Sequence, residues 1–129
     1  MADKMRTALL VDDNRMGREL AAEVLATAGF LVREASSVGE ALDALNVWCP
    51  DVVLLDWHLK GATGEVVLRQ LQTMSPRPYV VIVTADARDS VRSAAITGGA
   101  DSVLTKPYRI SALAAMMADA APEQTEGSI

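Results

Sequence analysis

Five short apolar runs without polar alternation constrain the fold more than any other feature of this chain. Such runs are typical of strands that are buried on both faces, and strands of this kind are usually parallel. Longer segments of helical periodicity lie between them, so that strands and helices are expected to alternate along the whole chain. The five runs are Ala8–Val11, Leu31–Val32, Val52–Leu55, Tyr79–Val83 and Val103–Leu104.

Five helices are expected, each following one of these runs. Gly29 suits the end of the first helix, and Ser37 with Glu40 forms a capping box at the start of the second. The alternation predicts an α/β fold, a doubly wound five-stranded parallel sheet with right-handed crossovers and helices on both faces. The helices are expected over residues 15–28, after Ser37, before Pro76, over residues 89–97, and from Ile110 to Pro122.

Length, charge and cysteine content narrow the class of protein. The 129 residues correspond to one domain, expected over residues 1–121, with a disordered tail or the start of a linker over residues 122–129. The formal net charge of −5 argues against direct nucleic-acid binding, and the single Cys49 excludes an internal disulfide. No apolar run approaches the length of a membrane span and no signal peptide is evident, so we expect a cytoplasmic protein without membrane insertion.

Polar residues follow four of the apolar runs, where the carboxyl ends of parallel strands bind ligands. Asp12 and Asp13 follow the first run, Asp56 the third, Thr84 the fourth and Lys106 the fifth. Converging carboxylates repel one another, and oxygen ligands of this kind suit Mg²⁺. A carboxylate, a divalent ion, an ammonium group and a hydroxyl together form a site for a phosphoryl group on an aspartate.

Each of these residues also has a purely structural interpretation. The acidic pair and the following Asn14 are favoured helix caps, and Thr84 is another candidate cap. Asp56 is suited to begin a turn, and a lysine such as Lys106 is usually solvated. These interpretations do not explain why all of the residues fall at the carboxyl ends of predicted strands. Trp48 and Trp57 are interpreted as packing residues, and the segment with Gly61 and Gly64 as a mobile loop.

These residues, with the strings around them, resemble the receiver domain of bacterial two-component response regulators, of the chemotaxis-regulator type. The strings are LLVDDN, PDVVLLDWHLKGATG, VIVTAD and GGADSVLTKPY, and the resemblance extends from about Thr7 to Ala121. It implies a flavodoxin-like arrangement of the sheet. It also implies a signalling module that catalyses only its own phosphorylation and dephosphorylation and turns over no external metabolite.

The resemblance implies a phosphoacceptor and a metal site. Asp56 is the implied phosphoacceptor. Asp13 is the implied direct ligand of Mg²⁺, or of Mn²⁺ in its place, and Asp12 contributes through water. Asp56 and the backbone carbonyl of His58 complete the implied ligand set.

The resemblance also implies a phosphoryl-binding switch and partners. Thr84, Ala85 and Lys106 are the implied phosphoryl-binding and switch residues, and Lys106–Pro107 is expected to be a cis peptide. The implied donor is a histidine kinase or a histidine phosphotransfer protein. The implied recipient of the signal is a downstream protein target or a second copy of the chain.

Three positions depart from the family pattern. Val103 stands where an aromatic switch residue is usual, Lys60 where proline is frequent, and Thr63 where aspartate is common. Because Val103 is too small and too stiff to occupy two alternative sites, activation is expected to reshape residues 85–99 without a side-chain switch. The output face is expected on the fourth helix, the fifth strand and the fifth helix, with Arg88, Arg92 and Arg109 as candidate contacts.

His58 and Asp86 are candidates for tuning the lifetime of the phosphoryl group. In the resembling family, the side chains two residues after the acceptor and two after the threonine flank the path of the attacking water. An imidazole or a carboxylate there can orient that water as a weak general base, or can crowd it. Together they are expected to set a moderate hydrolysis rate.

Two other functions compete with this interpretation. A haloacid-dehalogenase-like phosphatase also forms an aspartyl phosphate with Mg²⁺, but it needs a second aspartate two residues after the nucleophile, where this chain has His58. A flavodoxin-like cofactor carrier is disfavoured, because Asp12 and Asp13 would repel a ligand phosphate.

Overall fold

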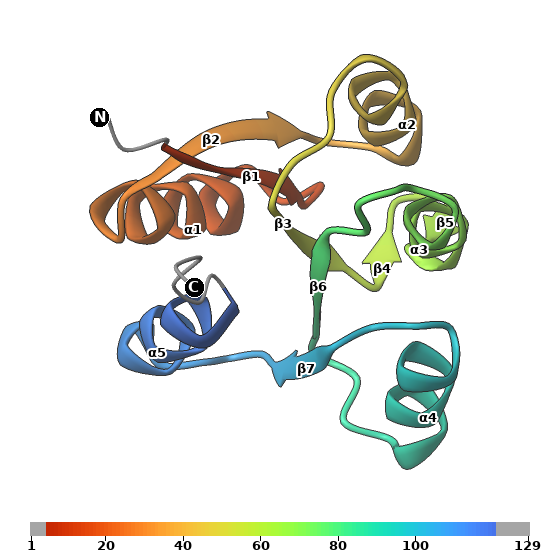
Figure 1. The fold of residues 1–129 in the computed structure, drawn as a ribbon. Helices are drawn as coiled ribbons and strands as arrows, with labels where there is room; N and C mark the ends of the chain where they lie inside the picture. Colours follow the sequence, from red (N-terminus) through yellow and green to blue (C-terminus); the bar gives the residue numbers. More distant parts are fainter. Residues whose placement is uncertain (1–4, 121–129) are drawn as a thin grey trace, which may run out of the picture.

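A five-stranded parallel sheet forms the centre of the computed structural model, which describes residues 5–120 (Figure 1). The strand order is β2-β1-β3-β6-β7, with every neighbouring pair parallel. This arrangement confirms the predicted fold, and each apolar run lies within a strand. The strands are β1 (Arg6–Val11), β2 (Phe30–Ala35), β3 (Val52–Asp56), β6 (Tyr79–Thr84) and β7 (Ser102–Thr105).

Helices cover both faces of the sheet. One face carries α1 (Arg15–Thr27) and α5 (Ile110–Ala120), and the other carries α2 (Val38–Val47), α3 (Glu65–Gln72) and α4 (Asp89–Thr97) (Figure 1). Alternate residues of the central strands point into one or the other of two apolar clusters, so the strands are buried on both faces, as their unbroken apolar runs predict. Among the described residues, no helix is long and apolar enough to cross a membrane.

The register of the sheet brings the predicted polar residues to one edge. Val11 pairs with Leu55, so the residues that follow them, Asp12 and Asp56, lie at the same level at the end of the sheet. Thr84 pairs with Thr105, and Lys106 comes next. Backbone hydrogen bonds continue past the strand ends, from the Trp57 N–H to the Val83 carbonyl at 2.9 Å and from the Lys106 N–H to the Thr84 carbonyl at 2.7 Å.

The segment after β3, for which the sequence predicts a mobile loop, contains regular secondary structure. It forms a small antiparallel hairpin of β4 (His58–Leu59) and β5 (Ala62–Thr63). Gly61 has a φ of 74°, which a residue with a side chain rarely adopts, and this glycine allows the tight turn. Two-residue strands are too short for a period-2 pattern to reveal them in the sequence.

The ends of two helices follow the predicted signals. The Ser37 hydroxyl accepts a hydrogen bond from the Glu40 N–H at 3.1 Å, and the Glu40 carboxylate accepts one from the Ser36 N–H at 2.7 Å. At the end of α1 the C-cap residue is Ala28, and Gly29 follows it with a φ of 99°. The predicted domain boundary at residue 121 and the tail over residues 122–129 lie outside the described residues.

Candidate functional site

Asp56 lies at the centre of the polar edge of the sheet, at the end of the central strand β3. Its side chain is only 9% exposed, and the Lys106 ammonium group donates a hydrogen bond to its Oδ2 at 3.0 Å. The other oxygen, Oδ1, accepts a hydrogen bond from the His58 N–H at 3.3 Å. Lys106 also lies 3.6 Å from Asp12 Oδ2, so it bridges two acidic residues and is not the solvated lysine of the structural interpretation.

Asp12 and Asp13 face Asp56 across the ends of β1 and β3. One carboxylate oxygen from each of the three residues lies within 4.8 Å of the others. Asp12 and Asp56 are buried and Asp13 is half-buried, so the cluster has an open side. Three converging oxygen ligands suit a hard divalent ion such as Mg²⁺, which retains several waters. The donor set therefore fits the metal that the sequence predicts.

The structure also shows which polar residues cap helices. Asn14 is the N-cap of α1, because its side chain accepts a hydrogen bond from the Gly17 N–H at 2.8 Å. This leaves the carboxylates of Asp12 and Asp13 available to the cluster. Thr84 is fully buried, and its hydroxyl accepts a hydrogen bond from the Asp86 N–H at 3.0 Å, while the N-cap position of α4 belongs to Arg88.

Burial and mutual charge shift the pKa values of the central pair. Burial raises the pKa of Asp56, and the charge of Asp12 adds to that rise against the opposing effect of Lys106. Burial alone would lower the pKa of Lys106, but its contacts with Asp56 and Asp12 outweigh burial and raise it. The site therefore holds the positive charge of Lys106 beside Asp56, and a further cation would stabilise the ionised form of Asp56.

A comparison with known protein families identifies the family of this chain. The model of the response regulator receiver domain matches residues 8–118, which is most of the chain. This chain belongs to that family. The match favours a signalling module over the phosphatase and cofactor-carrier alternatives, and it confirms the resemblance on which the site residues were expected.

Relatives of known structure share the fold of this receiver domain. A response regulator from Chloroflexus aurantiacus superposes with a TM-score of 0.83 at 29% identity, covering 90% of this chain and 97% of the other. A response regulator protein from Burkholderia pseudomallei, solved with a phosphorylated aspartic acid, a calcium ion and citrate, gives a TM-score of 0.80 at 25% identity, covering 90% of this chain and 66% of the other.

The curated relatives are longer than the receiver domain. The phosphate regulon transcriptional regulatory protein PhoB of Escherichia coli is 35% identical over 105 residues, which is 80% of this chain and 46% of PhoB. The chain thus spans about half the length of the curated relatives that it matches.

His58, Asp86 and Arg88 form a small polar group beside the receiver site. His58 Nε2 lies 3.4 Å from Asp86 Oδ2, and the Arg88 Nε donates to Asp86 Oδ1 at 2.8 Å. The hydrogen bonds from Arg88 hold the pKa of Asp86 well below its usual range. The His58 side chain is 53% exposed, and Asp86 is a partner that the sequence did not reveal. Ala85, between Thr84 and Asp86, is exposed.

Two further residues at the site escape sequence reasoning. Arg18 contacts the backbone carbonyl of Asp12, and Gly64 lies so close to the Asp56 carbonyl oxygen that an added Cβ would be 2.7 Å from it. Neither contact has a local sequence signal, because each joins segments whose proximity follows only from the fold. The Lys106–Pro107 peptide is cis, as the resemblance implies.

Proposed function

We propose that this receiver domain accepts a phosphoryl group on Asp56 from a phosphohistidine of a histidine kinase or a histidine phosphotransfer protein. The observation that carries the proposal is the buried Asp56 carboxylate, held between the Lys106 ammonium group and the carboxylates of Asp12 and Asp13. A carboxylate oxygen of Asp56 attacks phosphorus, the phosphorus–nitrogen bond breaks, and the donor imidazole retains the bonding electron pair. The same proposal includes that the domain acts as a signalling module and turns over no external metabolite.

The residues around Asp56 have distinct roles in this transfer. Asp12, Asp13, Asp56 and the His58 backbone carbonyl would hold Mg²⁺ or Mn²⁺, which when bound supplies positive charge to the transferring oxygens. Lys106 supplies a second positive charge, already fixed by its contact with Asp56 at 3.0 Å. The charge of Lys106 is in place before transfer begins, so this residue requires little reorganisation.

Thr84 and Ala85 connect the phosphoryl group to the rest of the molecule. The Thr84 hydroxyl holds the Asp86 N–H, so a Thr84 that turns toward a phosphoryl oxygen releases the start of the loop before α4. Val103 is half-buried and packs against the apolar cluster that contains Val91 of α4. The output therefore passes through residues 85–99 and the face formed by α4, β7 and α5, which would contact a downstream protein or a second copy of the chain.

Phosphorylation by acetyl phosphate tests the acceptor and the metal together. Intact-mass spectrometry should show one added phosphoryl group on the wild type in Mg²⁺, and none after the metal is chelated with EDTA. Asp56→Asn should show none in either condition. Asp51→Asn, at an exposed aspartate just before β3, is the matched control and should be phosphorylated normally. Undiminished phosphorylation of Asp56→Asn would overturn the assignment.

A further inference from the structure

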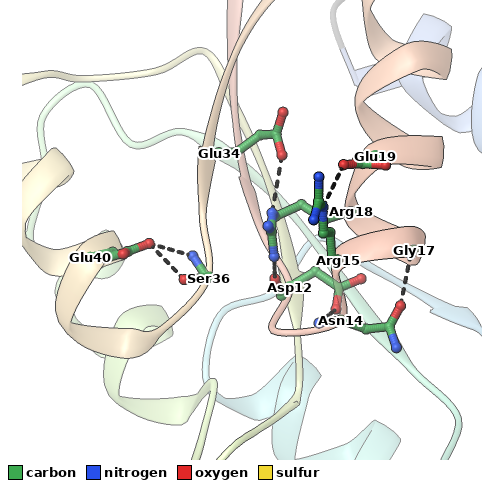
Figure 2. A network of polar contacts seen from close by, with 9 residues as sticks. All are labelled: Asp12, Asn14, Arg15, Gly17, Arg18, Glu19, Glu34, Ser36 and Glu40. Carbon is green, nitrogen blue, oxygen red and sulfur yellow. Dashed lines mark hydrogen bonds and ion pairs between the residues drawn. The ribbon is translucent and has the colours of Figure 1, made fainter.

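Arg18 ties the acidic loop after β1 to the edge strand of the sheet. From the second turn of α1, its Nη1 donates a hydrogen bond to the Asp12 carbonyl oxygen at 2.9 Å. Its Nε donates to Glu34 Oε1 of β2 at 3.0 Å. Figure 2 shows the guanidinium group between Asp12 and Glu34, and the Arg18 side chain is only 18% exposed. One side chain thus joins three elements at the site.

The remaining polar groups of Asp12 are also engaged. Its N–H donates to the Ala35 carbonyl at the end of β2 at 3.1 Å. Its Oδ1 accepts a hydrogen bond from the Asn14 N–H at 2.8 Å, and its Oδ2 lies 3.6 Å from Lys106. Arg18 donates to the Asp12 carbonyl oxygen, so every polar group of Asp12 has a partner. The backbone of Asp12 is therefore held on both sides, and Asp13 follows it directly in the chain.

We propose that Arg18 is a positioning residue that holds Asp12 and Asp13 in place for a divalent cation. The inference rests on the proposed function, because it assumes that these carboxylates hold the metal. Carboxylates that converge on one point repel each other, so a free loop would relax outward and would have to be drawn back when the cation binds. The planar guanidinium group, with its donors at fixed angles, is suited to hold a carbonyl and a carboxylate at once.

The positive charge of Arg18 acts against metal binding, whereas its positioning of Asp12 and Asp13 would favour it. A cation near an acidic pocket disfavours a second cation by Coulomb repulsion, although Glu34 partly compensates the charge. If charge were all that mattered, removal of Arg18 would strengthen Mg²⁺ binding. If positioning dominates, removal weakens it. The sign of the change separates the two accounts.

Arg15 provides a matched control on the same helix. It carries the same charge and forms a similar ion pair, with its Nε 2.9 Å from Glu19 Oε2, but its side chain is 82% exposed. Figure 2 marks this pair and the contact between Arg18 and the Asp12 carbonyl with separate dashed lines. Replacement of Arg15 changes the charge near the site without removing a contact to Asp12.

The experiment is a Mg²⁺ titration of purified protein, followed by the fluorescence of Trp57, which is buried beside Asp56, and by the Mg²⁺-dependent rise in Tm. We expect Arg18→Gln to raise the Kd about tenfold, the lower end of what loss of an outer partner of a metal ligand costs. Arg18→Lys keeps the charge but loses the double contact, and its Kd should rise at least threefold. Arg15→Gln should change the Kd less than twofold. Circular dichroism identifies the temperature range in which each variant is folded.

Two results would contradict the proposal in different ways. Unchanged or tighter Mg²⁺ binding by Arg18→Gln would overturn the positioning role while leaving the proposed function in place. If Arg18→Gln does not fold, Arg18→Lys decides, because the charge account predicts no change for it. A wild-type protein in which Mg²⁺ alters neither the fluorescence nor the Tm would overturn the metal site itself, and with it this inference.

Discussion

The two loops that flank Asp56 are held in different ways. The loop after β1, residues 12–14, is bound to the end of β2, to Lys106 and to Arg18 of α1. In the loop after β6, residues 85–88, the hydrogen bonds connect Asp86 with Thr84 and Arg88, and His58 approaches from an exposed hairpin. Under the proposed function, which requires the site to bind a metal and then transmit a change, we expect the loop after β1 to be the fixed side of the site and the loop after β6 to be its adaptable side.

The loss of Lys106 should have the largest effect, because this residue contacts both Asp56 and Asp12 on the fixed side. We expect Lys106→Ala to slow phosphorylation by acetyl phosphate about a hundredfold, as for the loss of a preorganised charge at a reacting group. Lys60→Ala, at the exposed turn of the β4–β5 hairpin, should leave the rate unchanged. A rate for Lys106→Ala within threefold of the wild type would show that the pair is structural only.

Gly64→Ala tests how tightly the backbone of the acceptor is held. An added Cβ would lie 2.7 Å from the Asp56 carbonyl oxygen, so β3 or α3 must shift, and we expect a loss of about 2 kcal/mol in the free energy of unfolding. In α2, a Cβ at Gly39 would meet its nearest atom, the Ser37 hydroxyl oxygen, at 3.9 Å. Gly39→Ala should therefore stabilise the protein by roughly 0.5–1 kcal/mol. Urea unfolding measures the change in the free energy of unfolding for both variants. Equal changes in Gly64→Ala and Gly39→Ala would refute the close packing around Asp56.

Asp56→Asn should stabilise the protein at neutral pH. Because burial raises the pKa of Asp56, the folded state binds its proton more tightly than the unfolded state does. Stability therefore falls as the pH rises from the ordinary aspartate pKa through the raised one, and the cost persists at pH 7. Replacement by asparagine should raise the Tm at pH 7 by roughly 3 °C and flatten this part of the pH profile. A lower Tm for Asp56→Asn would show that the contact with Lys106 outweighs burial.

The adaptable side should give the smallest effects. We expect His58→Ala and Asp86→Ala to change the lifetime of the phosphorylated protein by about twofold to fivefold, or up to ~1 kcal/mol in the barrier, because the family resemblance implies that each flanks the path of the attacking water. Asp89→Ala, at the exposed first residue of α4, serves as the control. Lifetimes within twofold of the wild type in both variants would remove His58 and Asp86 from the hydrolysis step.

The fixed parts of the site were predictable from the sequence because they follow from strand ends. Once the apolar runs identify parallel strands, residues such as Asp12 and Asp56 must leave the sheet at the same edge. The family pattern added their proposed roles and the cis peptide at Lys106. Neither argument required contacts between side chains.

The remaining side-chain contacts join residues that lie far apart in the sequence, and no local sequence pattern indicates them. The His58–Asp86 contact joins a hairpin to a different loop, and the contacts of Arg18 require both the register of β2 and the position of α1. The capping residue of α1 was also ambiguous, since Asp12, Asp13 and Asn14 are all favoured caps and only the geometry selects Asn14. Packing, more than local propensity, determines these details.

Hydrogen exchange tests the difference between the two loops most directly. It is measured with and without a beryllofluoride mimic of the phosphoryl group at Asp56, with Mg²⁺ present in both samples. If one side is fixed and the other adapts, protection should change in residues 85–99 while residues 12–18 and 34–36 keep theirs. Changes confined to α1 or α2, with residues 85–99 unaffected, would contradict the account.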